Sequence, residues 1–279
     1  METCPYDPFS EEVLTDPFPA YAALRESAPL HYFTEHDPPF YTVSRYDDVV
    51  GVLMDRVTWG NRYGAGPRFQ RGVGFNTDGP GHIAFRREVL TAFGAARIAG
   101  MAKEIEILVE RLIDEMVAHG PTDFHDAFAA PLPVTVIARM LGIDEADHSQ
   151  LKQLSDDLIS TVMNSTDPVA VGRVTTELDE FWVRQLEPRR AVLATLDEPG
   201  PECLGKVVPD DLMSALLLVR LDGRALTEFE ISNTLMNLLL GGNETTTSLL
   251  TNLLWRLLEV PERWAALLAD PALIDSAIE

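Results

Sequence analysis

Seven consecutive residues in the last fifth of the chain combine residue types that ordinary helices avoid. They are Gly241-Gly242-Asn243-Glu244-Thr245-Thr246-Thr247. Two glycines inside a helix cost roughly 1 kcal/mol each relative to alanine. Neighbouring threonines can bond back to helix carbonyls and bend the helix. Because sequences break such local rules mostly at functional sites, this segment is the first candidate for chemistry.

The residue types suggest what that chemistry would be. Without side chains, Gly241 and Gly242 would let a flat ligand lie against the backbone. A hydroxyl at Thr245 beside the carboxyl of Glu244 could order a water chain and deliver protons to a bound oxidant. The alternative is a kinked core helix whose glycines serve close packing.

A long helix is needed to position this segment. Thr227-Glu228-Phe229-Glu230 fits a capping box, with Thr227 as the N-cap. Apolar residues at helical spacing then predict a helix over 228–258, about 46 Å long at 1.5 Å per residue. The predicted apolar stripe is Ile231, Leu235, Leu238, Leu239, Gly242, Leu249, Leu253 and Leu257. A glutamate near a buried stripe needs a hydrogen-bond or charge partner, or a functional role, because an unpaired buried charge is unfavourable. Glu244 is therefore a candidate functional residue.

The segment 241–246 resembles the (Ala/Gly)-Gly-x-(Asp/Glu)-Thr-Thr motif of the cytochrome P450 haem-thiolate monooxygenases. In that family the motif lies on the long helix over the oxygen-binding face of haem. The resemblance implies that Glu244 and Thr245 are the acid–alcohol pair that assists O–O bond scission, and that Gly241 and Gly242 lie against the haem. Glycine at 241 replaces the commoner alanine.

A second segment, Asp78-Gly79-Pro80-Gly81-His82 followed by Arg86, resembles the family's Asp-x-Pro-x-His-x-x-x-Arg signature. Spacing of i and i+4 puts His82 and Arg86 on one helical face. Two donors there could bind the paired carboxylates of haem, the arginine in a bidentate manner. Taken alone, the pair would more often be two surface cations on an amphipathic helix.

Further segments match the family in the expected order over essentially the whole chain. They are Asp16-Pro17-Phe18 with Tyr21 and Leu24, Arg45 to Val49, Pro133 to Ile143, Asp210 to Thr227, Val260-Pro261-Glu262 and Ala277 to Glu279. The chain is therefore identified as resembling the bacterial soluble type. By this resemblance it ends just before the family's Glu-x-x-Arg motif and its haem-cysteine loop.

Because the chain ends before the haem-cysteine loop, the family's axial iron ligand cannot be assigned. Neither Cys4 nor Cys203 has the family's cysteine loop around it, so no metal ligand is assigned, and both are expected to be ordinary structural or solvent-facing cysteines. The thiolate normally pushes electron density toward dioxygen and favours O–O cleavage. If these 279 residues were the whole molecule, we would expect weak haem binding and no monooxygenase activity.

The periodicity predicts one mainly α domain over 1–279 with a small β portion, the cytochrome P450 fold without its C-terminal part. The expected strands are 30–33 and 40–43. The expected helices are 19–27, 45–54, 80–93, 97–118, 124–141, 145–164, 170–195, 210–221, 228–258 and 261–279. A loop from Asp55 to Asn76 is rich in glycine and aromatic residues, which favours a lid.

The resemblance also implies the cofactor and the partners. These are haem b, dioxygen, a small apolar organic substrate, and electrons from NAD(P)H through a ferredoxin or flavoprotein reductase. Substrate would lie between the aromatic loop (Trp59 to Phe75) and the Gly241 region.

Composition limits the other partners. Acidic residues outnumber basic ones 44 to 22, a net charge of −22, which argues against nucleic acid or an anionic membrane. The apolar stretch 235–258 includes Asn243, Glu244 and Arg256, each costly in lipid. Two cysteines fit a reducing cytoplasm, and the acidic N-terminus is unlike a signal peptide.

Two other functions stay open at this point. An all-α, magnesium-dependent prenyl-diphosphate enzyme would need acidic clusters at helical spacing, for which Asp156-Asp157 is the best candidate, without a third carboxylate at the right interval. The other alternative is a non-catalytic helical remnant that binds a partner.

Overall fold

The computed structural model describes residues 6–61, 74–163 and 168–278. Two compact units make up the chain, residues 1–86 and 87–279, and their boundary falls inside helix α4 (Gly79–Phe93). The expectation of one domain over the whole chain therefore stays a prediction. Within the described residues, no helix combines the length and the apolar character needed to cross a membrane.

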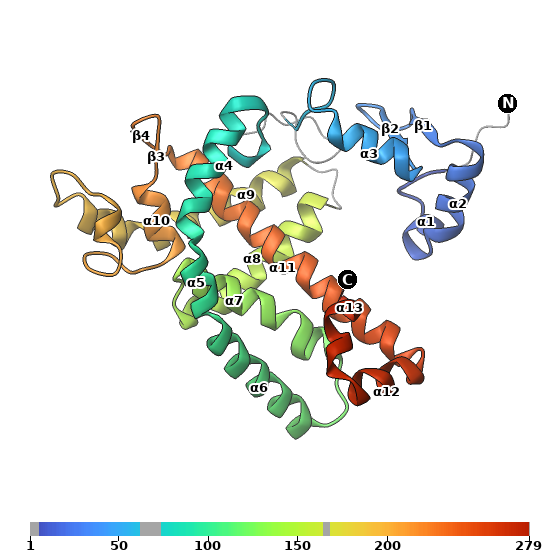
Figure 1. The fold of residues 1–279 in the computed structure, drawn as a ribbon. Coiled ribbons are helices and arrows are strands. Elements are labelled where there is room, and N and C mark those ends of the chain that lie inside the picture. Colours follow the sequence, from blue (N-terminus) through green and yellow to red (C-terminus); the bar gives the residue numbers. More distant parts are fainter. Residues whose placement is uncertain (1–5, 62–73, 164–167, 279) are drawn as a thin grey trace. The chain divides into compact units, whose positions relative to one another are not determined.

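The first unit is built around one β-hairpin (Figure 1). Strands β1 (Leu30–Phe33) and β2 (Phe40–Val43) pair antiparallel, with Leu30 opposite Val43 and Phe33 opposite Phe40. The helices of this unit before α4 are α1 (Glu11–Thr15), α2 (Phe18–Ser27) and α3 (Tyr46–Met54), followed by a 3₁₀ turn (Gly74–Asn76). Their small apolar core includes Tyr6, Val13 and Leu24.

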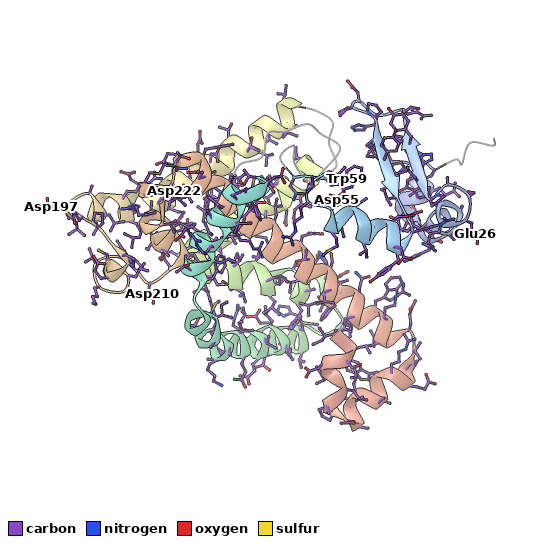
Figure 2. The ribbon with its side chains drawn as sticks, turned by 45° about the horizontal axis from the view of Figure 1, so that its top comes forward. Glu26, Asp55, Trp59, Asp197, Asp210 and Asp222 are labelled. Atoms are coloured by element: carbon purple, nitrogen blue, oxygen red, sulfur yellow. The ribbon has the colours of Figure 1, made fainter. Side chains whose placement is uncertain are left out.

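The loop after α3 begins at Asp55 and contains Trp59 (Figure 2). Trp59 is about half exposed, and Phe75, at the other end of the loop, packs edge-to-face on Phe85. Most of the predicted aromatic lid, residues 62–73, lies outside the described residues, so its role stays a prediction.

The second unit is almost entirely helical. Its elements after α4 are α5 (Ala95–Gly100), α6 (Ala102–His119), a π-helix (His125–Ala129), α7 (Pro131–Leu141), a 3₁₀ turn (Glu145–Asp147), α8 (His148–Leu158), a π-helix (Ile159–Met163), α9 (Pro168–Leu193), a 3₁₀ turn (Pro201–Cys203), α10 (Leu212–Leu218), strands β3 (Arg220–Leu221) and β4 (Arg224–Ala225), α11 (Glu228–Leu258), α12 (Pro261–Ala269), a 3₁₀ turn (Pro271–Leu273) and α13 (Ile274–Ile278).

Helix α11 is the axis of this unit (Figure 1). It packs most extensively against α7 and also contacts the π-helix His125–Ala129, α9 and α12. Large side chains of α8, α9 and α10, such as Leu158, Trp182 and Leu212, are fully buried in this unit. Acidic side chains, among them Asp197, Asp210 and Asp222, lie in the connections between α9 and α11 (Figure 2).

Both predicted strands and the helix 228–258 are confirmed, and the mainly α fold class with them. Five predicted helices are wrong in part. The helix at 124–141 is a π-helix followed by α7, and the helix at 145–164 is a 3₁₀ turn, α8 and a π-helix. The helix at 97–118 is divided at Met101. The helix at 261–279 is divided at Asp270, because Pro271 disfavours the α region for the residue before it. The helix at 210–221 stops at Leu218, because Asp222 and Gly223 both have positive φ and close a two-residue hairpin turn.

Candidate active site on helix α11

The start of α11 has the predicted capping box. The Thr227 hydroxyl accepts a hydrogen bond from the Glu230 backbone N–H at 3.2 Å, and the Glu230 carboxylate accepts one from the Thr227 N–H at 2.8 Å. Arg224 donates twice to the same carboxylate, at 2.8 Å each. These bonds, Arg224's above all, lower the pKa of Glu230 to about 2. The beginning of the helix is therefore strongly determined by residues within seven positions of each other.

The buried face of α11 differs from the predicted stripe. The buried side chains are Ile231, Thr234, Leu235, Leu239, Asn243 and Thr247. Two polar residues, Asn243 and Thr247, thus occupy the core-facing positions in the middle of the helix, whereas Leu249 is 44% exposed. Sequence reasoning missed both polar residues because it assigned the core face to apolar residue types.

The opposite face carries the predicted catalytic pair. Gly241, Glu244 and Thr245 are all exposed, and their spacing of three and four residues places them on one side of the helix. Among the described residues, a Cβ atom added at Gly241 would meet no atom within 4 Å. The Thr245 hydroxyl donates to the Gly241 carbonyl at 2.7 Å. Glu244 is exposed, so the expectation that burial would force a partner on it is wrong.

The two glycines face different surroundings. A Cβ atom at Gly242 would lie 3.4 Å from Cδ1 of Ile137 on α7, an ordinary van der Waals contact. Gly242 therefore brings α11 close to α7, which is the packing alternative, while Gly241 faces open space. Contact of Gly242 with a cofactor stays a prediction.

The second predicted pair lies in the first unit, on α4. His82 is half-buried, and its Nδ1 is buried without a hydrogen-bond partner among the residues described by the structure. Arg86 is exposed. Asp78, at the start of the same signature, accepts a hydrogen bond from the Asn61 N–H at 2.7 Å and would collide with any side chain at Gly60. His82 is thus not a plain surface cation.

The chain was compared with protein-family models and with known proteins. No protein-family model matches the chain. Nocardicin C N-oxygenase of Nocardia uniformis subsp. tsuyamanensis is 32% identical over 283 residues, which are 98% of this chain and 66% of that protein. Vitamin D3 dihydroxylase of Streptomyces griseolus is 32% identical over 292 residues, 99% of this chain and 64% of that protein.

Solved structures give the same result. The Bacillus subtilis cytochrome P450 PksS matches with a TM-score of 0.80 and 27% identity, covering 98% of this chain and 67% of that one. A mutant of P450 EryK in complex with erythromycin B matches with a TM-score of 0.76 and 30% identity, covering 95% and 64%. The chain belongs to the cytochrome P450 family.

Membership confirms the resemblance drawn from residues 78–86 and 241–246 and the P450 fold. This P450 chain spans about two thirds of the length of the curated relatives that it matches. Its Cys203 is buried in an apolar cluster with Leu193, Val208 and Leu218, a structural position as expected. Cys4 lies outside the described residues.

Other polar groups of the P450 chain do not favour the magnesium alternative. Asp156 forms an ion pair with Lys152 at 2.6 Å, and Asp157 accepts a hydrogen bond from Gln153. In the described part of the chain, the carboxylates and imidazoles close enough to share a metal are Asp123, His125 and Asp126, all exposed.

A pocket of about 230 Å³ lies between α9 and the start of α11. Its polar groups are already paired within the protein. Asp179 accepts a hydrogen bond from Ser232, and Glu228 forms an ion pair with Arg190.

Proposed function

We propose that this chain forms the oxygen-handling part of a haem-dependent monooxygenase. The reaction inserts one atom of dioxygen into a small apolar organic substrate. Electrons come from NAD(P)H through a ferredoxin or a flavoprotein reductase, in the cytoplasm. Family membership supports this proposal, as do relatives named as an N-oxygenase, a dihydroxylase and a hydroxylase.

One observation carries the proposal to this chain. Gly241, Glu244 and Thr245 are exposed on one side of α11, where a Cβ atom at position 241 would meet none of the described residues within 4 Å. In the same segment of the helix, Asn243 and Thr247 are buried. The helix therefore presents a flat strip of backbone flanked by a carboxyl and a hydroxyl, and keeps its other face in the core.

Residues of each unit suit one part of haem b. In the second unit, Gly241 leaves room for a flat ring. In the first unit, Arg86 is exposed and the Nδ1 of His82 has no hydrogen-bond partner among the described residues, so both could hold propionate carboxylates. When bound, haem supplies the binding and reductive activation of dioxygen. The protein's part is to bind, orient and move protons.

The proton-handling groups have defined roles in this proposal. The Thr245 hydroxyl donates a hydrogen bond to the Gly241 carbonyl, so its oxygen atom can accept hydrogen bonds from water. The exposed Glu244 carboxyl takes a proton from solvent and passes it through water toward the Thr245 Oγ1. Thr245 then orders the last donor of that chain.

The test is Thr245→Ala and Glu244→Gln in the protein expressed from its own gene. We expect both variants to bind haem, as seen by the carbon monoxide difference spectrum after reduction. Product formed per oxygen consumed should fall, with oxygen diverted to hydrogen peroxide and water. The matched control is Thr245→Ser, which keeps the hydroxyl and should keep coupling. Unchanged coupling in Thr245→Ala would remove Thr245 from the mechanism.

A further inference from the structure

Beneath the exposed motif, two buried side chains of α11 reach out to other parts of the second unit. The Asn243 amide donates to the Ser155 hydroxyl on α8 at 2.9 Å, and both residues are at least nine-tenths buried. The Thr247 hydroxyl donates to the backbone carbonyl of Ala129 at 3.1 Å. It also lies 3.4 Å from Oδ1 of Asn243. The pair therefore ties α11 to two elements about 90 and 120 residues earlier in the chain.

The Thr247 bond is an unusual use of a helical threonine. Thr234, also buried on α11, donates to Glu230 O of its own helix at 2.6 Å, and Thr245 likewise donates to Gly241 O. Thr247 instead donates to another element. Ala129 ends a π-helix, and the residue four positions later is Pro133, which has no N–H. The Thr247 hydroxyl thus supplies a donor that the Ala129 carbonyl cannot receive from its i+4 residue.

At these positions, directional hydrogen bonds can fix the rotation of the helix, whereas apolar contacts cannot. A leucine stripe tolerates small rotations and shifts of a helix, since van der Waals contact has no preferred direction. One step along the helix is a rotation of about 100°, so a modest rotation would turn Glu244 or Thr245 away from the open side. Buried polar groups are retained for such register roles in other helical proteins.

We propose that Asn243 and Thr247 are positioning residues that set the rotation and axial register of α11. They hold Gly241, Glu244 and Thr245 on the open side, without touching the cofactor or the substrate. This inference rests on the proposed function for its catalytic consequence, but the positioning itself is a property of the protein alone.

The test compares Thr247→Val with Thr234→Val in the protein expressed from its own gene. Both substitutions keep the side-chain shape at a buried threonine of the same helix, but only the first removes a bond to another element. Hydrogen exchange of amides 241–248 is measured without added haem. We expect Thr247→Val to speed their exchange by roughly fivefold, the factor that one net hydrogen bond represents. Thr234→Val should leave it unchanged.

Coupling of oxygen consumption to product is the second measurement. Thr247→Val should uncouple, Thr234→Val should not, and Thr247→Ser should restore both readouts by restoring the hydroxyl. If Thr247→Val folds poorly, Ser155→Ala tests the other positioning residue, because it removes the acceptor of the Asn243 amide. We expect the same faster exchange and the same loss of coupling. Equal exchange at 241–248 in the Thr247 and Thr234 variants overturns the positioning role. A lack of monooxygenase activity in every variant, with the exchange difference present, would overturn the proposed function instead.

Discussion

Two buried polar clusters in the described part of the second unit differ in charge. In the Arg189 cluster, Arg189 on α9 donates to Asp211 at 2.5 Å, to the Gly142 carbonyl at 2.7 Å and to Ser214 at 3.2 Å. In the Asn243 cluster, Asn243 donates to Ser155 and Thr247 donates to the Ala129 carbonyl. Both clusters join three elements that are distant in sequence.

The difference between them shows two uses of buried polarity. The charged groups of the Arg189 cluster are stable only while all of them are paired, because an unpaired buried charge is very unfavourable. Gly142 has φ +79°, and a Cβ atom there would lie 2.1 Å from an Asp211 oxygen, so the cluster also excludes any side chain at that position. The Asn243 cluster is neutral and lies under the exposed motif. Charge serves to hold the helices together, and the neutral bonds orient one of them.

Breaking the charged cluster should have the largest effect. We expect Arg189→Met to lower the free energy of unfolding by about 3–5 kcal/mol, because Asp211 would be left buried and unpaired. Denaturant unfolding measures this. Arg184→Met, an exposed arginine on the same helix, is the control and should cost far less. A loss below about 1 kcal/mol for Arg189→Met would mean that the pair is solvated.

The neutral cluster should cost less to break. Ser155→Ala leaves the Asn243 amide without its acceptor, and we expect a loss of about 1–3 kcal/mol. Ser160→Ala, at an exposed serine whose hydroxyl donates to the Asp157 carbonyl, is the control for the same substitution. Replacing both partners, Ser155→Ala with Asn243→Leu, should recover part of the loss, since neither side then has an unsatisfied polar group. No recovery in the double variant would show that packing, and not the hydrogen bond, was lost.

A cluster nearer the surface gives a smaller effect that depends on pH. The pKa of Glu230 is lowered from 4.5 to about 2, chiefly by Arg224. Because the folded pKa lies below the unfolded one, the stabilisation is present above pH 4.5 and is lost as the pH falls toward 2. We expect Glu230→Gln to be less stable than the parent by about 1 kcal/mol at neutral pH, the usual size of a cap. The difference should vanish near pH 2, and a constant difference across pH would contradict the assignment.

The smallest effect should come from the open face. We expect Gly241→Ala to raise the free energy of unfolding by up to about 1 kcal/mol, because alanine favours the helix and meets no neighbour. The same variant should still bind haem, since alanine is the commoner residue at this position of the family motif. Gly242→Ala is the comparison, and it should gain less stability, because its added Cβ atom would lie 3.4 Å from Ile137. An equal gain in both variants would contradict the difference in surroundings between the two glycines.

Prediction from the sequence succeeded where the signals are local. The capping box of Thr227 and Glu230, the bounds of α11 and the hairpin β1–β2 depend on residues close together in the chain. It failed where an apolar pattern continued past a real break, as at Asp270 and Val219. An apolar residue type indicates that a side chain is buried, but it does not show where a helix ends.

The motif at 241–246 and its order among the other segments determined the family and the residues worth testing. The orientation of that motif was decided only by tertiary structure. Periodicity alone gave Gly242 and Leu249 the same inward face, whereas Ile137 lies against Gly242 and Leu249 is nearly half exposed. The physical reason is that the rotation of a helix depends on the partners it packs against. Here those partners, Ser155 and the Ala129 carbonyl, lie far away in the sequence and belong to no pattern within the helix itself.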